Sequence, residues 1–192
     1  MRADKKIGDY KLVIYSSYID EVKMICNLIF KLFHYKPSLR KRLYGFNKTI
    51  NYEIIIHSKK LVYFFNKNFD VPIGKKSLTI NLPKLSDNLI YKLNFIRGVI
   101  DGNGCVRKNS NLSICSGSYL FLIGMKKLLN EIIKSSEVLF NGTCYNLYIS
   151  MNSLPKLFYL LYYSGDYFYE RRKSKLEQIL STKQISVFNL NQ

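Results

Sequence analysis

The chain has 192 residues, of which 47% are hydrophobic, so it can bury a sizeable core, and this composition excludes an intrinsically disordered protein. Thirty lysines and arginines against thirteen acidic residues give a net charge of +17, which favours a polyanionic partner because like charges repel in a compact chain. We find no secretory signal and no apolar run as long as a membrane span, and therefore expect an intracellular protein (cytoplasmic, nucleoid or organellar) that does not enter membranes.

The first half of the chain alternates between strand-like and helix-like patterns. Its strands show β-branched residues and alternation, and its long helix has apolar residues every three or four positions. The predicted elements, in order, are strands at 5–7 and 10–17, a helix at 18–33, strands at 36–45 and 50–58, and a helix at 59–69.

The second half repeats this order after a connector at 71–83 that contains Pro and Gly. Its predicted elements are strands at 105–110 and 111–118, a helix at 119–136, a strand at 145–150, and helices at 154–163 and 166–180. The last of these helices has no counterpart in the first half. A repeat of this length predicts two duplicated modules of an α+β fold.

Residues 86–101, between the two copies, are predicted to form a helix rather than the buried strand that is the competing interpretation. Ser86 and Asp87 can cap it, and apolar residues follow at helical spacing. Gly98 and Gly102 lie four residues apart on one side of this helix. Because glycine costs a helix about 1 kcal/mol relative to alanine, we expect another backbone to approach closely there.

Cysteine spacing argues against a structural metal site. The four cysteines (Cys26, Cys105, Cys115 and Cys144) form no C-x-x-C pair, and the two histidines are too distant in sequence to complete a zinc pattern. Small buried thiols in a reducing compartment are the simplest interpretation.

The positive charge is concentrated in residues 31–60, which hold eight lysines and arginines and one acid, Glu53. Aromatic residues are interleaved with them, which is typical of nucleic-acid-binding segments, although a solvated face is the alternative. The candidate DNA-binding residues are Lys36, Arg40, Lys41, Arg42, Lys48, Arg107 and Lys108.

Residues 96–104, Ile-Arg-Gly-Val-Ile-Asp-Gly-Asn-Gly, resemble the nine-residue LAGLIDADG motif of homing endonucleases. The stretches "IGKKSLTINLP" and "SGDYFYERRKSKLEQIL" resemble the linker and the closing helix of intein-type and archaeal members. The resemblance covers roughly residues 5–180. It implies duplicated αββαββα modules with saddle-shaped antiparallel sheets: a first module with its linker at 1–85, a second at 86–180, and a tail at 181–192.

The resemblance also implies an activity. In the family, two motif helices pack through small residues, and each delivers a carboxylate to divalent metal ions that cleave both DNA strands. The sheets hold the duplex in its major groove. For this chain, the family therefore implies metal-dependent phosphodiester hydrolysis of duplex DNA, with Mg²⁺ or Mn²⁺ as cofactor and an intron-encoded or intein-like origin.

Two departures from the motif bear on that activity. The family's metal-binding acid is the eighth motif position, which is Asn103 here, whereas Asp101 holds the sixth. The first module also lacks its motif helix. The chain's own repeat aligns Asp4 with the first catalytic acid. The candidate catalytic residues are therefore Asp4, Asp101 and Asn103, with Asp4 and Asp101 as metal ligands and with Gly98 and Gly102 as helix-packing residues.

Three roles stay open. The first is an endonuclease, either fully active or weakened to nicking. The second is a binding descendant without cleavage, such as a maturase that binds intron RNA or a regulator. The third is a fragment that needs a missing segment or a partner chain. A stripe of Leu89, Leu93, Ile96 and Ile100 would be exposed without the sister helix. We therefore expect residues 87–102 to pair in a homodimer, to bind a partner helix, or to be covered by the tail.

Overall fold

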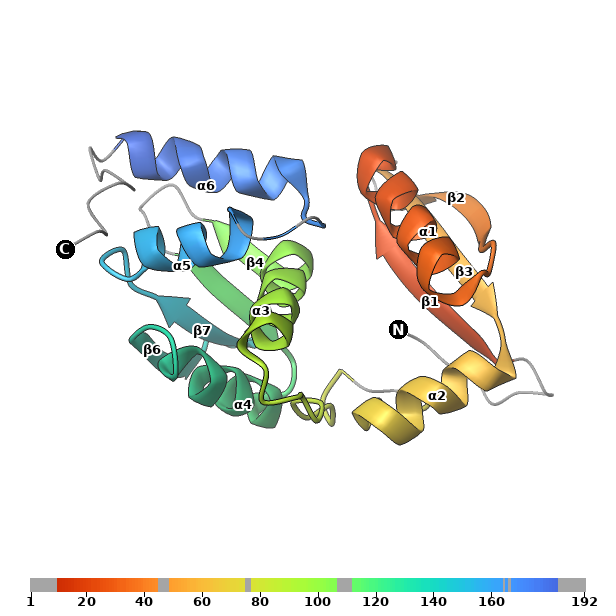
Figure 1. Ribbon diagram of the computed structural model, residues 1–192, viewed down its shortest axis with the longest axis horizontal. Coiled ribbons are helices and arrows are strands. Elements are labelled where there is room, and N and C mark those ends of the chain that lie inside the picture. Colours follow the sequence, from red (N-terminus) through yellow and green to blue (C-terminus); the bar gives the residue numbers. More distant parts are fainter. Residues whose placement is uncertain are drawn as a thin grey trace. The chain divides into compact units, whose positions relative to one another are not determined.

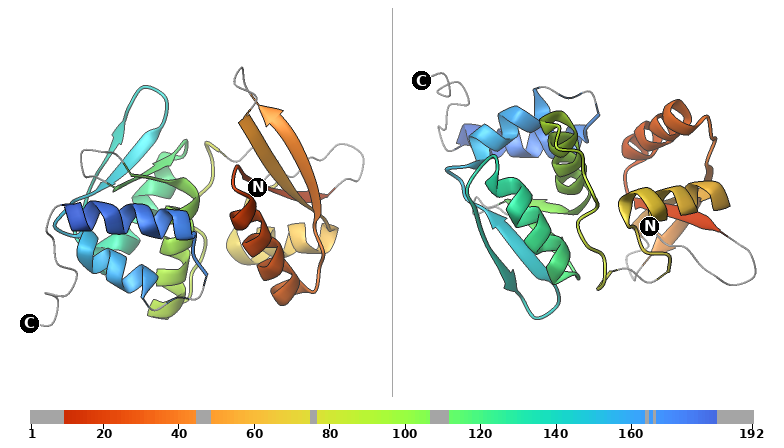
Figure 2. Two further views of the ribbon diagram at one scale, coloured as in Figure 1. Left: turned by 90° about the horizontal axis from the view of Figure 1, so that it is seen from above. Right: turned by 60° about the horizontal axis from the view of Figure 1, so that its bottom comes forward.

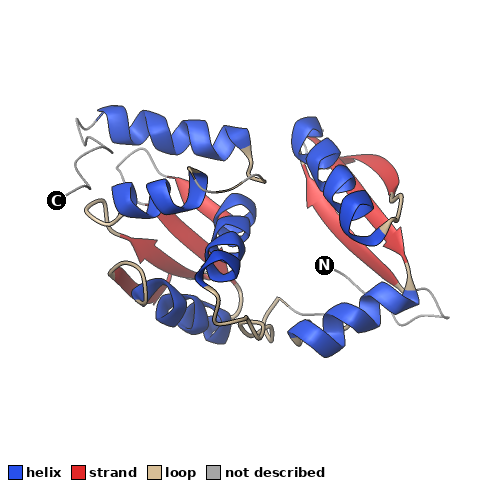
Figure 3. Cartoon of the chain, viewed as in Figure 1, coloured by secondary structure: helices blue, strands red, loops and turns tan. Residues whose placement is uncertain are grey.

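The structure is a computed structural model that describes residues 10–44, 49–74, 77–106, 112–163, 165 and 167–182. It divides into two compact units, Met1–Lys76 (unit 1) and Ser77–Gln192 (unit 2), each of which combines helices with an antiparallel sheet (Figures 1 and 3). Among the described residues, no helix combines the length and apolar character needed to cross a membrane.

Unit 1 contains a three-stranded sheet in the order β1-β3-β2. Its elements are β1 (Lys11–Ser16), α1 (Ile19–Phe33), β2 (Ser38–Tyr44), β3 (Thr49–His57) and α2 (Lys59–Phe69). Helix α2 begins where the Ser58 side chain accepts a hydrogen bond from the Leu61 amide, and α1 ends at His34 in the left-handed conformation.

The core of unit 1 lies between its sheet and its helices. Val22, Ile25 and Ile29 recur at helical spacing along α1 and are buried. Leu12 and Ile56 are opposite each other in the β1–β3 pairing and are also buried. Both helices lie on one face of this sheet (Figure 2), and the other face carries the buried pair Val13 and Ile55 beside more accessible residues.

Unit 2 contains a four-stranded sheet in the order β4-β5-β7-β6. Its elements are α3 (Leu89–Asn103), β4 (Gly104–Val106), β5 (Leu112–Ser116), α4 (Tyr119–Asn130), β6 (Ser135–Phe140), β7 (Tyr145–Ile149), α5 (Leu154–Tyr162) and α6 (Glu170–Thr182). The series β5-α4-β6-β7-α5 repeats the series β1-α1-β2-β3-α2 of unit 1, and the sheet orders β5-β7-β6 and β1-β3-β2 agree. The α+β class and the two antiparallel sheets predicted from the sequence are confirmed.

The connector between the modules packs along unit 2. Ser118 Oγ donates a hydrogen bond to the Ile80 carbonyl at 2.6 Å. A Cβ at Gly124 would lie 2.7 Å from the Leu82 Cβ, and one at Gly117 would lie 2.7 Å from the Ser77 carbonyl oxygen. At Gly117 and Gly124, the close approach that requires glycine is therefore made by the connector against α4 and the turn before it.

The structure corrects the predicted end of α4 and the predicted cap of α3. Helix α4 ends at Asn130 rather than at 136, because β6 follows it and pairs with β7. The N-cap of α3 is Asn88, whose Oδ1 accepts from the Ile90 amide at 2.8 Å, rather than Ser86 or Asp87. The strand predicted at 105–110 is described only as β4; residues 107–110 and the strand predicted at 5–7 lie outside the described residues.

Candidate functional site

Asp101 lies near the C-terminal end of α3, and its side chain faces the interior of unit 2. Its Oδ1 accepts a hydrogen bond from the Tyr162 hydroxyl at 2.7 Å, and its Oδ2 accepts one from the Tyr169 amide at 2.9 Å. Burial raises the pKa of the Asp101 carboxyl above its ordinary value, although these hydrogen bonds and the nearby arginine charges act in the opposite direction. Both carboxylate oxygens are thus engaged inside the unit.

Two buried arginines surround this carboxylate. Arg97 donates from Nε to the Tyr167 carbonyl and from a terminal nitrogen to the Leu161 carbonyl, each at 2.8 Å. Arg172, on α6, donates to the main-chain carbonyl of Asp101 at 3.4 Å. A Cβ at Gly165 would collide with the Arg97 guanidinium, so glycine lets the α5–α6 connection pass over it.

This network holds α5, α6 and their connection against the end of α3. Sequence reasoning missed Arg97, Tyr162 and Arg172 as its members. The one available signal was Arg97, a charged residue inside the otherwise uncharged stretch Phe95–Ile100 of α3. Such a residue is buried only when its charge and donors are satisfied.

The end of α3 does not assemble a metal site from the described residues. Asn103 is exposed at the last position of α3, but a neutral amide is a weak ligand for a hard cation. Nowhere in the described ranges do three or more His, Cys, Asp or Glu residues cluster so that they could hold a metal ion. Asp4 lies outside these ranges. The donors that the described residues place at the end of α3 therefore do not by themselves fit Mg²⁺ or Mn²⁺.

The glycine side of α3 is open. A Cβ at Gly98 or Gly102 would meet no described atom within 4 Å. The expected exposure of the apolar stripe is wrong for Leu93, Ile96 and Ile100, which are buried in the core of unit 2, whereas Leu89 is exposed. The accessible side of α3 carries the residues of a different stripe at helical spacing, namely Tyr91, Phe95, Gly98 and Gly102.

The basic residues of β2 are divided between the two faces of the unit 1 sheet. Arg40 is paired with Glu53 and Arg42 with Asn51, so both arginines share a face with Glu53, whereas Lys41 is on the opposite face. On the neighbouring strand β1, Tyr15 is paired with Glu53 and therefore lies on the same face as the two arginines. We call the surface formed by Tyr15, Arg40, Arg42, Asn51 and Glu53 the arginine face.

An acid lies at the centre of the arginine face. The Glu53 side chain is 6% exposed, while those of Arg40 and Arg42 are 58% and 46% exposed. Arg42 Nε is 3.1 Å from Glu53 Oε1, and a terminal nitrogen of Arg40 is 3.8 Å from Oε2. One carboxylate therefore faces two arginines whose outer parts remain accessible. Of the other predicted contacts, Lys36 is exposed before β2, and Lys48, Arg107 and Lys108 lie outside the described residues.

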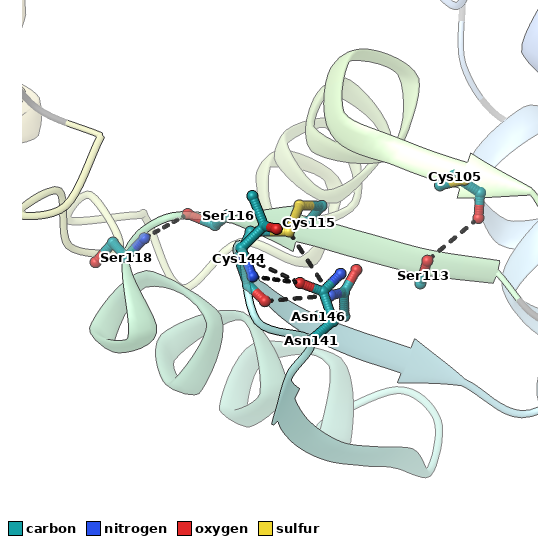
Figure 4. The surroundings of a disulfide bond; sticks show 9 residues. Cys105, Ser113, Cys115, Ser116, Ser118, Asn141, Cys144 and Asn146 are labelled. Atoms are coloured by element: carbon teal, nitrogen blue, oxygen red, sulfur yellow. Dashed lines mark hydrogen bonds between the residues drawn. A yellow bond between two sulfur atoms is a disulfide. The ribbon is translucent and has the colours of Figure 1, made fainter.

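The corresponding face of unit 2 is uncharged along β4, β5 and β7. It carries Cys105, Ser113, Cys115, Asn146 and Tyr148, which alternate with the core residues of these strands. Figure 4 shows Cys115 joined to Cys144 by a disulfide, so the expectation of free thiols fails for this pair. The separation of 29 residues hid the pairing, which the β5–β7 register creates. Cys26 and Cys105 are free.

No family model matches the sequence, and no curated protein matches it. Several solved structures are similar. A mesophilic variant of the homing endonuclease I-DmoI matches at 19% identity and a TM-score of 0.65, over 92% of this chain and 88% of that one. I-WcaI bound to its DNA recognition sequence matches at 16% identity and a TM-score of 0.62, over 92% and 79%.

The N-terminal LAGLIDADG domain of WhiA matches at 14% identity and a TM-score of 0.56, over 91% and 80%. Further structures of I-DmoI contain DNA with Ca or with Mn. At these identities the similarity concerns architecture, and it agrees with the motif resemblance of residues 96–104. The chain therefore has the fold of the LAGLIDADG homing endonucleases.

Proposed function

We propose that this chain binds duplex DNA and that the arginine face of unit 1 makes the principal contact. The observation that carries the proposal is the pair of accessible arginines, Arg40 and Arg42, on the sheet face opposite the helices. The net charge of +17 supports it, as does the fold, since I-WcaI and I-DmoI are each known bound to DNA. Arginine is suited to both phosphate oxygens and base edges.

The other basic residues supply phosphate contacts in this proposal. Lys36, Lys48, Arg107 and Lys108 fix the duplex in place, while the arginine face carries the contacts to bases. Lys41 contributes less, because it lies on the opposite face of the sheet.

The test is equilibrium binding of the full chain to fluorescent mixed-sequence duplex DNA, to single-stranded DNA and to duplex RNA. Duplex DNA should bind most tightly, with an affinity that falls steeply as salt is added. The major groove of duplex RNA is too narrow for a sheet face to enter, so the proposed contact requires DNA. Tighter binding to duplex RNA would therefore support the RNA-binding alternative. If the chain bound none of the three nucleic acids, the proposal would be refuted.

The cleavage activity of this chain is weak or absent in our proposal. Asn103 replaces an acid, and both oxygens of Asp101 accept hydrogen bonds inside unit 2. Asp4, Asp101 and Asn103 remain the candidate catalytic residues, and the metals used with I-DmoI make Mg²⁺ or Mn²⁺ the ions to test. A binding protein without efficient double-strand cleavage is therefore favoured over an active endonuclease.

The open side of α3 is a packing surface for a second helix in this proposal, supplied by another copy of the chain or by a partner. Replacing Gly98 with leucine should place a side chain in the contact and weaken association. Sedimentation of the wild type and of Gly98→Leu tests this. Equal monomeric behaviour of both proteins at high concentration would exclude self-association through this helix.

A further inference from the structure

Glu53 is an unusual residue for a surface that contacts DNA. A carboxylate there removes one positive charge from the face that attracts phosphates, so its direct electrostatic effect on DNA affinity is unfavourable. It is also buried, and both of its oxygens face arginines. Its contribution to binding must therefore come from where it places those arginines or from the folding of unit 1.

The duplication inside the chain separates these two roles. Tyr15 pairs with Glu53 in unit 1, and Cys115 pairs with Asn146 in unit 2, at matching places in the repeated strands. Asn146 is 3% exposed, so the fold accepts a buried neutral amide at this position. Across the next strand, Arg40 in unit 1 is matched by Leu139 in unit 2. The acid and its arginine thus occur together in unit 1 and are both replaced in unit 2.

We propose that Glu53 is a positioning residue that orients Arg40 and Arg42 toward guanines within a short stretch of duplex DNA. This inference rests on the proposed DNA-binding function. The Arg42 atom that meets Glu53 is Nε, 3.1 Å from Oε1, so this ion pair does not depend on the two terminal nitrogens of Arg42. A guanidinium can donate two parallel hydrogen bonds to O6 and N7 of guanine in the major groove, which a lysine ammonium cannot reproduce.

Strand geometry sets the spacing of the two contacts. Arg40 and Arg42 are two residues apart on one face, and a strand rises about 3.4 Å per residue. Successive bases on one DNA strand are also separated by about 3.4 Å. Two arginines anchored to one carboxylate can therefore reach guanines about two base-pair steps apart. The expected recognition element is a pair of G·C pairs within about three base pairs.

The experiment is selection of bound duplexes from a randomised pool by the full-length wild type, followed by sequencing. The selected DNA should be enriched in two closely spaced G·C pairs. Glu53→Gln preserves the size of the side chain, removes its charge and replaces one of its two acceptor oxygens with a donor NH2 group. It should bind mixed-sequence duplex at least as tightly as the wild type, while its preference for the selected guanines falls about fivefold or more, as for loss of one bidentate contact.

Two further variants make the result decisive. Arg42→Lys keeps the charge and removes the planar fork, so it should keep mixed-sequence affinity but lose guanine preference. Asp20→Asn removes an acid of unit 1 that is 92% exposed on α1, and should keep the guanine preference. It therefore controls for the change in net charge.

The outcomes are distinguishable. Unchanged guanine preference in Glu53→Gln or in Arg42→Lys would overturn the positioning role while leaving DNA binding intact. Equal weakening on all duplexes, together with a lower unfolding midpoint for Glu53→Gln, would show that Glu53 acts only through folding. Failure of the wild type to bind duplex DNA would overturn the proposed function and this inference with it. If Glu53→Gln does not fold, Arg42→Lys still decides.

Discussion

Two buried carboxylates show how far single residues can be interpreted from sequence. Asp101 belongs to the motif resemblance, which implies a place near catalysis, yet its oxygens bind Tyr162 and the Tyr169 amide. Glu53 was only the lone acid in a basic segment, yet it is buried and forms ion pairs with two arginines. In both cases the partners come from other elements and depend on packing or register, which local sequence does not specify.

The hydroxyl of Tyr162 should stabilise unit 2 by donating to Asp101. Tyr162→Phe leaves a buried carboxylate oxygen without that donor, which should lower the free energy of unfolding by about 1–3 kcal/mol at neutral pH. Losing the hydrogen bond raises the Asp101 pKa further above its unfolded value. A raised carboxyl pKa means stability that is present at low pH and is lost as pH rises through the folded-state pKa.

The destabilisation by Tyr162→Phe should therefore shrink as pH falls and Asp101 becomes protonated. Urea unfolding of both proteins at several pH values measures this. Tyr159→Phe, which changes an exposed tyrosine on the same helix, is the matched control and should have little effect. A loss for Tyr162→Phe that grows toward acid pH would contradict the assignment.

The arginine face and Lys41 should differ in salt dependence. On mixed-sequence DNA the arginines are available to phosphates, and each lost contact reduces the slope of log K against log salt by about 0.9. Replacing Arg40 and Arg42 with alanine should thus flatten the slope by about two units. Lys41→Ala, on the other face of the sheet, should leave it nearly unchanged. If Lys41→Ala flattened the slope as much as the double arginine variant, the DNA would not contact the arginine face selectively, and the prediction would be wrong.

At the level of elements, most of the fold follows from sequence pattern. The spacing of Val22, Ile25 and Ile29 predicts α1, and the order of elements reveals the duplication. The predicted end of α4 was wrong because Ile132 and Ile133 continue the apolar pattern of the helix. In the structure the chain turns there toward β6, and the pairing of β6 with β7 is a tertiary interaction that local pattern does not specify. Helical periodicity places Gly98 and Gly102 on one side of α3 without saying what packs there, and in the structure a Cβ at either position meets no described atom within 4 Å.

Two glycine substitutions should therefore have different effects on stability. Gly98→Ala adds a methyl group where nothing described lies within 4 Å, so it should stabilise the chain by about 0.5–1 kcal/mol through helix propensity. Gly124→Ala places the same group 2.7 Å from the Leu82 Cβ and must displace the connector, so overpacking should outweigh the helical gain. Urea midpoints at low protein concentration measure both. Equal stabilisation would mean that the connector does not pack on α4.

At the level of the whole molecule, duplication of the fold was not accompanied by duplication of the surface. The strands of both units share a pattern, with Leu12 and Ile14 matched by Leu112 and Ile114. Their other faces differ, since unit 1 presents arginines and unit 2 presents uncharged residues along β4, β5 and β7. The net charge of the sequence predicts a polyanionic partner for the chain, whereas our proposal that unit 1 carries the specificity depends on the strand register.

The last prediction concerns cleavage of DNA by the whole chain. With Mg²⁺ or Mn²⁺, the wild type should leave supercoiled plasmid DNA largely uncut, because the exposed end of α3 carries an amide and Asp101 is engaged inside unit 2. Asn103→Asp adds a charged oxygen ligand of the kind these ions prefer, so it should increase metal-dependent nicking. Asn103→Gln keeps the amide and should not. Gel analysis of nicked and linear plasmid, with chelator as control, measures all three proteins. Efficient double-strand cleavage by the wild type that persists in Asp4→Ala and Asp101→Ala would show that another set of residues performs the reaction.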